Sequence, residues 1–106
     1  MDHVDWDRLN ELRADIGEED FADVAMLFVA ELQETLDKLT PEKATTADFH
    51  FLRGSAANLG FVTLVDACSL AEAACNASEK PDVNAVSRAF AAALNEVAPH
   101  VPELAA

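Results

Sequence analysis

Hydrophobic residues recur along the chain at the three- and four-residue spacing of amphipathic helices. The first such stretch predicts a short helix over residues 5–15, with Gly17 as its C-terminal stop. The second predicts a long helix over residues 19–39. This helix should end before Pro41, because the residue that precedes a proline disfavours the helical conformation.

Three more helices are predicted in the rest of the chain. The segment 45–48 (Thr-Thr-Ala-Asp) resembles a capping box at a helix start, and Gly60 can close the helix that it opens. A fourth helix is expected over residues 61–77, with a thin stripe of small apolar residues and a candidate cap at residues 63–66. A fifth is expected over residues 82–97, because two later prolines break the pattern.

These helices, together with the low glycine content and the absence of alternating Val, Ile or Thr runs, predict an all-α fold. Short connections favour antiparallel neighbours. We therefore expect an antiparallel up-and-down four-helix bundle with an additional short N-terminal helix as a lid. A chain of 106 residues suits one core, so residues 1–106 should form a single domain. Met1 and the short tail after Pro102 favour a free-standing protein over part of a larger kinase, but leave both open.

The composition is strongly acidic, with 20 Asp and Glu against 7 Lys and Arg and a formal net charge of −13. Thirteen of the acidic residues lie in residues 1–42. This charge repels phosphate backbones and anionic lipids, so we expect neither nucleic acid nor membrane as a partner. No apolar run approaches the roughly 20 residues that span a bilayer, and the first residues lack a signal-peptide pattern. We expect a cytoplasmic monomer.

Cysteine and histidine spacing gives little support to a disulfide or a metal site. Cys68 and Cys75 lie on one predicted helix, where the helical rise places their Cα atoms about 10 Å apart, beyond the reach of a disulfide. We interpret them as small core residues. A metal site built from them and His3, His50 and His100 is disfavoured, because the sequence has no Glu-x-x-His pair or close Cys/His cluster.

His50 lies on the third predicted helix, on the side opposite its apolar stripe. At about 100° per residue, Leu52, Ser55 and Leu59 cluster on one side and His50 falls roughly opposite Leu59. The imidazole should therefore face solvent. By itself it could be a surface histidine with no role. A neutral imidazole is nevertheless available near pH 7 and can attack phosphorus without a separate base.

Two neighbours favour a functional histidine. Arg53 lies on the same helical face, where its guanidinium could offset the charge of a transferring phosphoryl group and hydrogen-bond its oxygens. Gly54 costs about 1 kcal/mol relative to alanine in mid-helix. Either it lets a partner surface approach the backbone, or it permits close packing between helices of the same bundle. We favour the partner, because Gly54 lies nearer the His50 side than the apolar side.

The stretch from His50 to Phe61, HFLRGSAANLGF, resembles the signature H-x-L-K-G-S-S/A-x-x-L/I-G of histidine-containing phosphotransfer (HPt) domains. The histidine, both glycines, both leucines, the serine and the small residue agree in register. Arg53 occupies a position where the family usually has lysine. The compact ammonium group of lysine is thus replaced by a planar guanidinium group. The resemblance covers nearly the whole chain, since the family also has two helices before the motif and one after it.

This resemblance implies a histidine phosphotransfer protein of a multistep two-component phosphorelay. His50 would accept a phosphoryl group from a receiver-domain aspartyl phosphate and pass it to another receiver aspartate. The implied partners are response-regulator receiver domains and a hybrid histidine kinase. The module would be a phosphocarrier without autonomous kinase activity and would bind no cofactor itself, because Mg²⁺ is held by the receiver.

The resemblance also implies site residues around His50. The family often carries Glu or Gln 22 positions after the histidine, and this position is Glu72 here. A carboxylate that accepts the Nδ1 proton would leave Nε2 as the nucleophile, although Glu72 could also be an ordinary surface acid. The receiver is expected to cover the His50 face and to contact Gly54, Ala57 and Phe61, with exposed apolar groups of the first two helices.

Two other function classes are weighed against this one. A non-catalytic acidic helical interaction module would bind receiver or kinase domains without phosphotransfer, but the joint presence of His50, Arg53 and Gly54 argues against it. The dimerisation helix of a histidine kinase is disfavoured, because the pattern after His50 lacks the proline typical of such helices and no ATP-binding domain follows.

Overall fold

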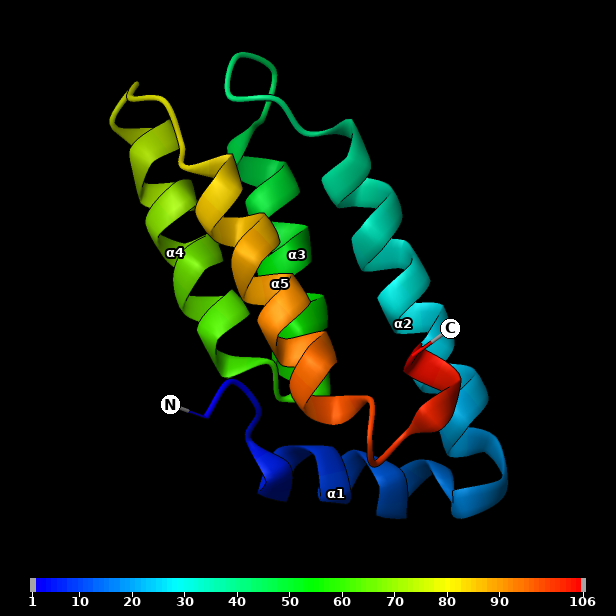
Figure 1. The fold of residues 1–106 in the computed structure, drawn as a ribbon. Helices are drawn as coiled ribbons and strands as arrows, with labels where there is room; N and C mark the ends of the chain where they lie inside the picture. The colour runs from blue at the N-terminus through cyan, green and yellow to red at the C-terminus, as the bar shows by residue number, and fades with distance from the viewer. Residues whose placement is uncertain (1, 106) are drawn as a thin grey trace.

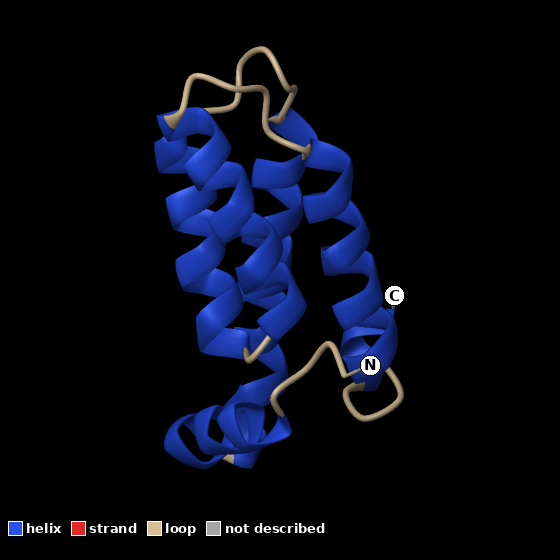
Figure 2. Ribbon diagram, turned by 90° about the vertical axis from the view of Figure 1, so that its left-hand side faces the viewer, coloured by secondary structure: helices blue, strands red, loops and turns tan. Residues whose placement is uncertain are grey.

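Helices make up all the regular structure of residues 2–105, the part of the chain that the computed structural model describes. They are, in chain order, α1 (Trp6–Ile16), α2 (Glu18–Lys38), α3 (Thr46–Leu59), α4 (Val62–Asn76), α5 (Val83–Val97) and the short 3-10 helix η1 (Pro102–Ala105). No strand occurs among these residues (Figure 2), which confirms the predicted all-α class. The expectation drawn from Met1 falls outside the described residues.

The four helices α2 to α5 run alongside one another, and α1 lies across one end of them (Figure 1). The chain passes through the four in alternating directions. Within this arrangement α3 packs against α4, α2 and α1, while α5 packs against α4 and η1. The placement of α3 is therefore decided by three other helices.

Local sequence signals set several helix ends as predicted. The Thr45 hydroxyl accepts a hydrogen bond from the Asp48 backbone N–H, and the Asp48 carboxylate accepts one from the Thr45 N–H, which forms the expected capping box of α3. Gly60 ends α3 in the left-handed conformation, with φ +74°. The Asp82 carboxylate caps α5 by accepting a bond from the Ala85 N–H.

The beginning of α4 differs from the prediction. The helix already begins at Val62, before the cap that was expected at residues 63–66. No side chain caps its first turn. The Thr63 hydroxyl instead shares a hydrogen bond of 2.9 Å with Nδ1 of His3. This bond joins residues that are distant in sequence, so no local sequence pattern could have predicted it. The short helix η1 was likewise not predicted.

Apolar side chains from all five α-helices form the core. The largest fully buried ones are Phe49, Phe61, Leu9, Leu32, Leu52, Leu59, Leu64, Val86, Val97 and Cys68. Both cysteines are free. Cys68 is a buried core residue, as expected. Cys75 is half-buried and packs against the core.

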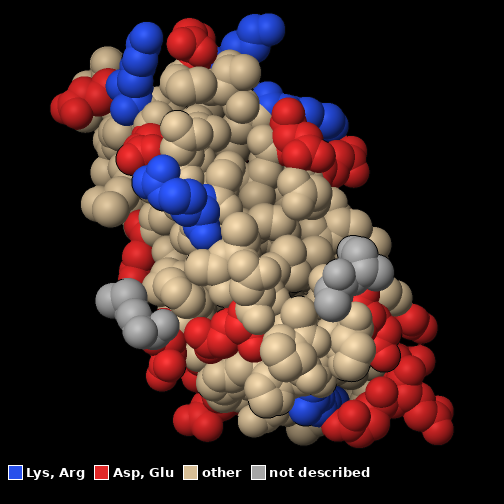
Figure 3. Space-filling model, in the orientation of Figure 1, with Lys and Arg blue, Asp and Glu red and all other residues tan. Residues whose placement is uncertain are grey.

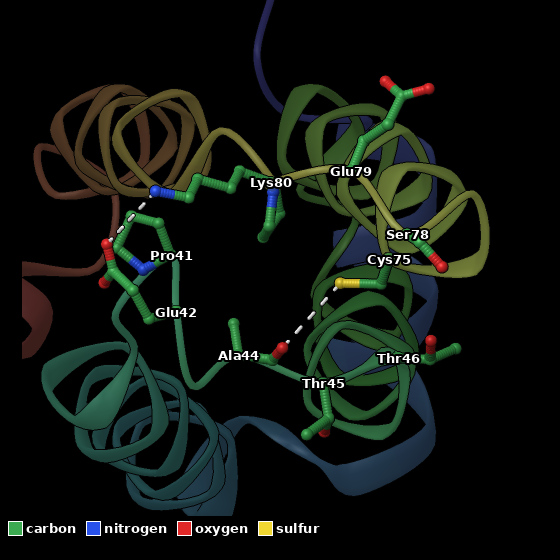
Figure 4. Close-up of a pocket in the computed structure, with 10 residues that line it drawn as sticks. Pro41, Glu42, Ala44, Thr45, Thr46, Cys75, Ser78, Glu79 and Lys80 are labelled. Atoms are coloured by element: carbon green, nitrogen blue, oxygen red, sulfur yellow. Dashed lines mark hydrogen bonds and ion pairs between the residues drawn. The ribbon is translucent and has the colours of Figure 1, made fainter.

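An open cleft of about 600 Å³ lies between the α2–α3 and α4–α5 connections, at the opposite end of the fold from α1 (Figures 1 and 4). In it the Cys75 Sγ lies 3.9 Å from the carbonyl oxygen of Ala44, and Lys80 Nζ lies 3.7 Å from a Glu42 carboxylate oxygen. The first contact joins α4 to the α2–α3 connection, and the second joins the two connections to each other.

Charge is distributed unevenly over the surface. In Figure 3, Asp and Glu side chains gather most densely at the end where α1 and the start of α2 lie. The first turn of α2 alone contributes Glu18, Glu19 and Asp20. None of the helices in the described part of the chain is both long and apolar enough to cross a membrane.

Candidate functional site

His50 projects from the middle of α3, and 71% of its side chain is exposed. The buried residues of this helix lie on its other side and include Phe49, Leu52 and Leu59. The prediction that the imidazole stands clear of the core is therefore confirmed. A partner protein can reach the ring without any rearrangement of the helices.

Three of the predicted site residues come together in space. Nη2 of Arg53 lies 3.0 Å from Nδ1 of His50 and 3.1 Å from Oε2 of Glu72. The second carboxylate oxygen of Glu72, Oε1, lies 3.6 Å from the same Nδ1. A residue of α4 thus meets two residues of α3, and one guanidinium nitrogen stands between the imidazole and the carboxylate.

Burial increases from the imidazole toward the helix interface. The exposed fraction of the side chain is 38% for Arg53 and 18% for Glu72. Beneath them Cys68 is fully buried. Burial raises the pKa of the Cys68 thiol to about 12, while the Arg53 charge lowers this pKa and the Glu72 charge raises it. Of the three side chains at the site, the His50 imidazole is therefore the most exposed and the Glu72 carboxylate the most buried.

Gly54 leaves a gap in the surface one turn after His50. A Cβ built on this glycine would meet no neighbouring group within 4 Å, its own helix backbone aside. The alternative that Gly54 serves close packing between helices of this bundle is therefore wrong. Gly54 and Ala57 are both exposed, so a flat strip of small residues adjoins the imidazole.

The expectation that Phe61 contacts a partner is wrong, because its side chain is fully buried. The left-handed conformation of Gly60 turns the chain after α3, and Phe61 then occupies the N-cap position of α4 with its ring in the core. The helical phase of α3, if it continued past Gly60, would place Phe61 on the His50 face, but the turn at Gly60 ends that phase. Phe51, which follows His50 in α3, is the aromatic residue that is exposed next to the site. The helical phase of α3 could have predicted this exposure.

The other histidines have separate surroundings. His3 bonds to Thr63, and the His100 ring lies edge-on to Trp6 with a centroid distance of 4.8 Å. No group of three His, Cys, Asp or Glu side chains that could hold a metal ion occurs within residues 2–105. The metal-site alternative gains no support from the structure.

The fold and the site together define a small helical domain that presents one exposed histidine beside an arginine and a glutamate. The family model of the Hpt domain matches residues 19–100, and the chain belongs to this family. Members act in phosphotransfer within phosphorelays, where they interact with receiver domains and kinases. The match begins in α2, so α1 lies outside it. Neither the curated proteins nor the solved structures contain a match to the chain.

Proposed function

We propose that this chain is a histidine phosphotransfer protein of a multistep two-component phosphorelay, built on an up-and-down four-helix bundle. His50 accepts a phosphoryl group from a receiver-domain aspartyl phosphate and passes it to another receiver aspartate. The observation that carries this proposal is the exposed imidazole within the motif from His50 to Gly60, with Arg53 and Glu72 in contact beside it.

The chemistry requires little from this chain beyond a positioned nucleophile. The lone pair of an imidazole nitrogen forms the N–P bond while the P–O bond to the receiver aspartate breaks, and the aspartate carboxylate takes the electron pair. The Arg53 guanidinium offsets charge on the phosphoryl oxygens. No nucleotide is required, because the phosphoryl group arrives as an activated acyl phosphate. The receiver would supply the Mg²⁺.

The docking surface for the receiver is formed by α3 and the adjoining flank of α2. Gly54 and Ala57 leave it flat, and Phe51 contributes an apolar side chain that is 44% exposed. On α2, Leu27 is 60% exposed. Met26 and other residues of α2 line a groove that faces α5 and η1. Leu27 lies on the flank of α2 that points away from this groove. Exposed apolar groups around a reactive residue are typical of a protein-binding site.

The test is a transfer assay with phosphorylated receiver domains. The wild-type protein should acquire acid-labile, alkali-stable label, and His50→Gln should lose it completely. His100→Gln is the matched control, because His100 is also exposed but its ring contacts Trp6 of α1. Label that persists in His50→Gln would contradict the assignment. Receivers that bind without transferring label would instead support the non-catalytic interaction module.

A further inference from the structure

The contact between Arg53 and His50 can be a hydrogen bond in only one tautomer of the neutral imidazole. A guanidinium carries only donors, so Nη2 of Arg53, at 3.0 Å, donates to Nδ1 and Nδ1 must hold the lone pair. The single proton of the neutral ring then lies on Nε2. The same Nη2 also donates a hydrogen bond of 3.5 Å to Oε1 of Glu72 and lies 3.1 Å from its Oε2.

This resting tautomer cannot react at the nitrogen that a partner reaches. Nδ1 is occupied by Arg53 and faces Glu72, so Nε2 is the nitrogen left for an incoming phosphoryl group. A nitrogen that carries a proton in a neutral imidazole has its remaining electron pair in the aromatic system, and it is no nucleophile. Reaction at Nε2 therefore requires the proton to be on Nδ1.

We propose that Arg53 is a switch that holds His50 in its unreactive tautomer until a phosphorylated receiver docks. This inference rests on the proposed function of His50. The dianionic phosphoryl group draws the Arg53 guanidinium away from Nδ1. Glu72 Oε1, at 3.6 Å, then accepts the Nδ1 proton and fixes the reactive tautomer. Arg53 acts on the phosphoryl group and Glu72 is a positioning residue.

The Arg53 and Glu72 side chains differ in their freedom to move, which supports this exchange. The Arg53 side chain is 38% exposed and can turn outward, whereas Glu72 is 18% exposed and anchored on α4. A phosphoryl dianion also attracts a guanidinium more strongly than a single carboxylate does. Once Arg53 has left, a displacement of less than about 1 Å brings Glu72 into hydrogen-bonding distance of Nδ1.

The steps balance without a further reactant. Nε2 releases its proton to water and Nδ1 takes one up, so the ring stays neutral. The Nε2 lone pair then forms the N–P bond as the P–O bond to the receiver aspartate breaks, and the aspartate leaves as a carboxylate. The positive charge that develops on the phosphorylated ring is offset by Glu72 through the Nδ1–H bond.

The first test measures the His50 tautomer in the free protein from the ¹⁵N shifts of the ring nitrogens at mildly alkaline pH. The wild type should carry the proton on Nε2. Arg53→Met keeps side-chain length without a donor and should shift the tautomer ratio toward Nδ1–H by roughly fivefold. Adding Glu72→Met to that variant removes the acceptor for the Nδ1 proton and should reverse most of the shift. An unchanged ratio in Arg53→Met, or an Nδ1–H wild type, would overturn the proposal.

The second test adds a receiver domain that carries beryllofluoride, a stable mimic of aspartyl phosphate. The wild-type tautomer should move toward Nδ1–H, and ³¹P spectra of the phosphorylated protein should place the phosphoryl group on Nε2. A phosphoryl group on Nδ1 would contradict the switch while leaving the proposed function intact. Absence of any label on His50 would contradict the proposed function, and the tautomer of the free protein is measured independently of that result.

Discussion

Nη2 of Arg53 on α3 lies 3.1 Å from Oε2 of Glu72 on α4. Partly exposed ion pairs contribute little to the free energy of folding, about 0–1 kcal/mol, so the value of this pair lies in orientation. It keeps a cation at the nucleophile in a chain whose net charge is −13.

Glu72→Met should lower the rate of phosphotransfer without destabilising the fold. Groups that orient a reactive imidazole typically change activity by about 10- to 100-fold when they are replaced. Because methionine can neither accept the Nδ1 proton nor offset the charge of the phosphorylated ring, we expect a loss of at least about tenfold in single-turnover transfer. Glu79→Met, at an exposed acid in the connection between α4 and α5, should transfer normally. Equal rates in the two variants would refute a positioning role.

Replacement by alanine should change the stability of the fold in opposite directions at Gly54 and Gly60. Gly54→Ala adds a methyl group in open space and should stabilise the fold by up to about 1 kcal/mol. Gly60→Ala should destabilise it by at least about 1–2 kcal/mol, because φ is +74° and the new Cβ would lie 2.7 Å from the carbonyl oxygen of Asp5. Urea unfolding of both variants measures the difference. A stabilised Gly60→Ala would show that the α3–α4 turn is misassigned.

Gly54→Arg should abolish transfer while leaving helical content and the melting temperature nearly unchanged. The long side chain would occupy the gap beside His50 that the receiver surface must enter. Ala91→Arg adds the same side chain at an exposed position of α5 and is the control. If Gly54→Arg transfers label as fast as the control, the receiver does not approach the backbone at this point.

Cys68 should make the fold sensitive to alkaline pH. Its pKa is raised from 9.0 to about 12 in the folded protein, so the unfolded chain loses this proton first as the pH rises. The stabilisation is complete below pH 9 and is lost between pH 9 and about 12, at about 1.4 kcal/mol per pH unit.

Cys68→Ala lacks this titration. The variant should be less stable near neutral pH, because the buried thiol leaves a cavity. Its deficit should shrink as the pH rises from 9 to 11, which urea unfolding at a series of pH values can measure. A constant deficit would show that the thiol is not desolvated. In the native wild type at neutral pH, Cys68 should also resist thiol reagents.

The helices and the exposed histidine could be predicted from the sequence, because both depend on neighbours within one or two turns. The capping box at Thr45, the stop at Gly60 and the solvent-facing phase of His50 are all local features. The contact of Glu72 with the site was implied by a spacing of 22 residues, but which atoms meet was not.

The sequence by itself determined an all-helical chain with one histidine turned outward, since helical periodicity is set by nearest neighbours along the backbone. Only the tertiary structure decided that Phe61 is buried and that Arg53 bridges His50 and Glu72. These outcomes depend on how α3 and α4 rotate and cross when their apolar faces pack together. That packing sums contacts from residues distant in sequence, and no local pattern records it.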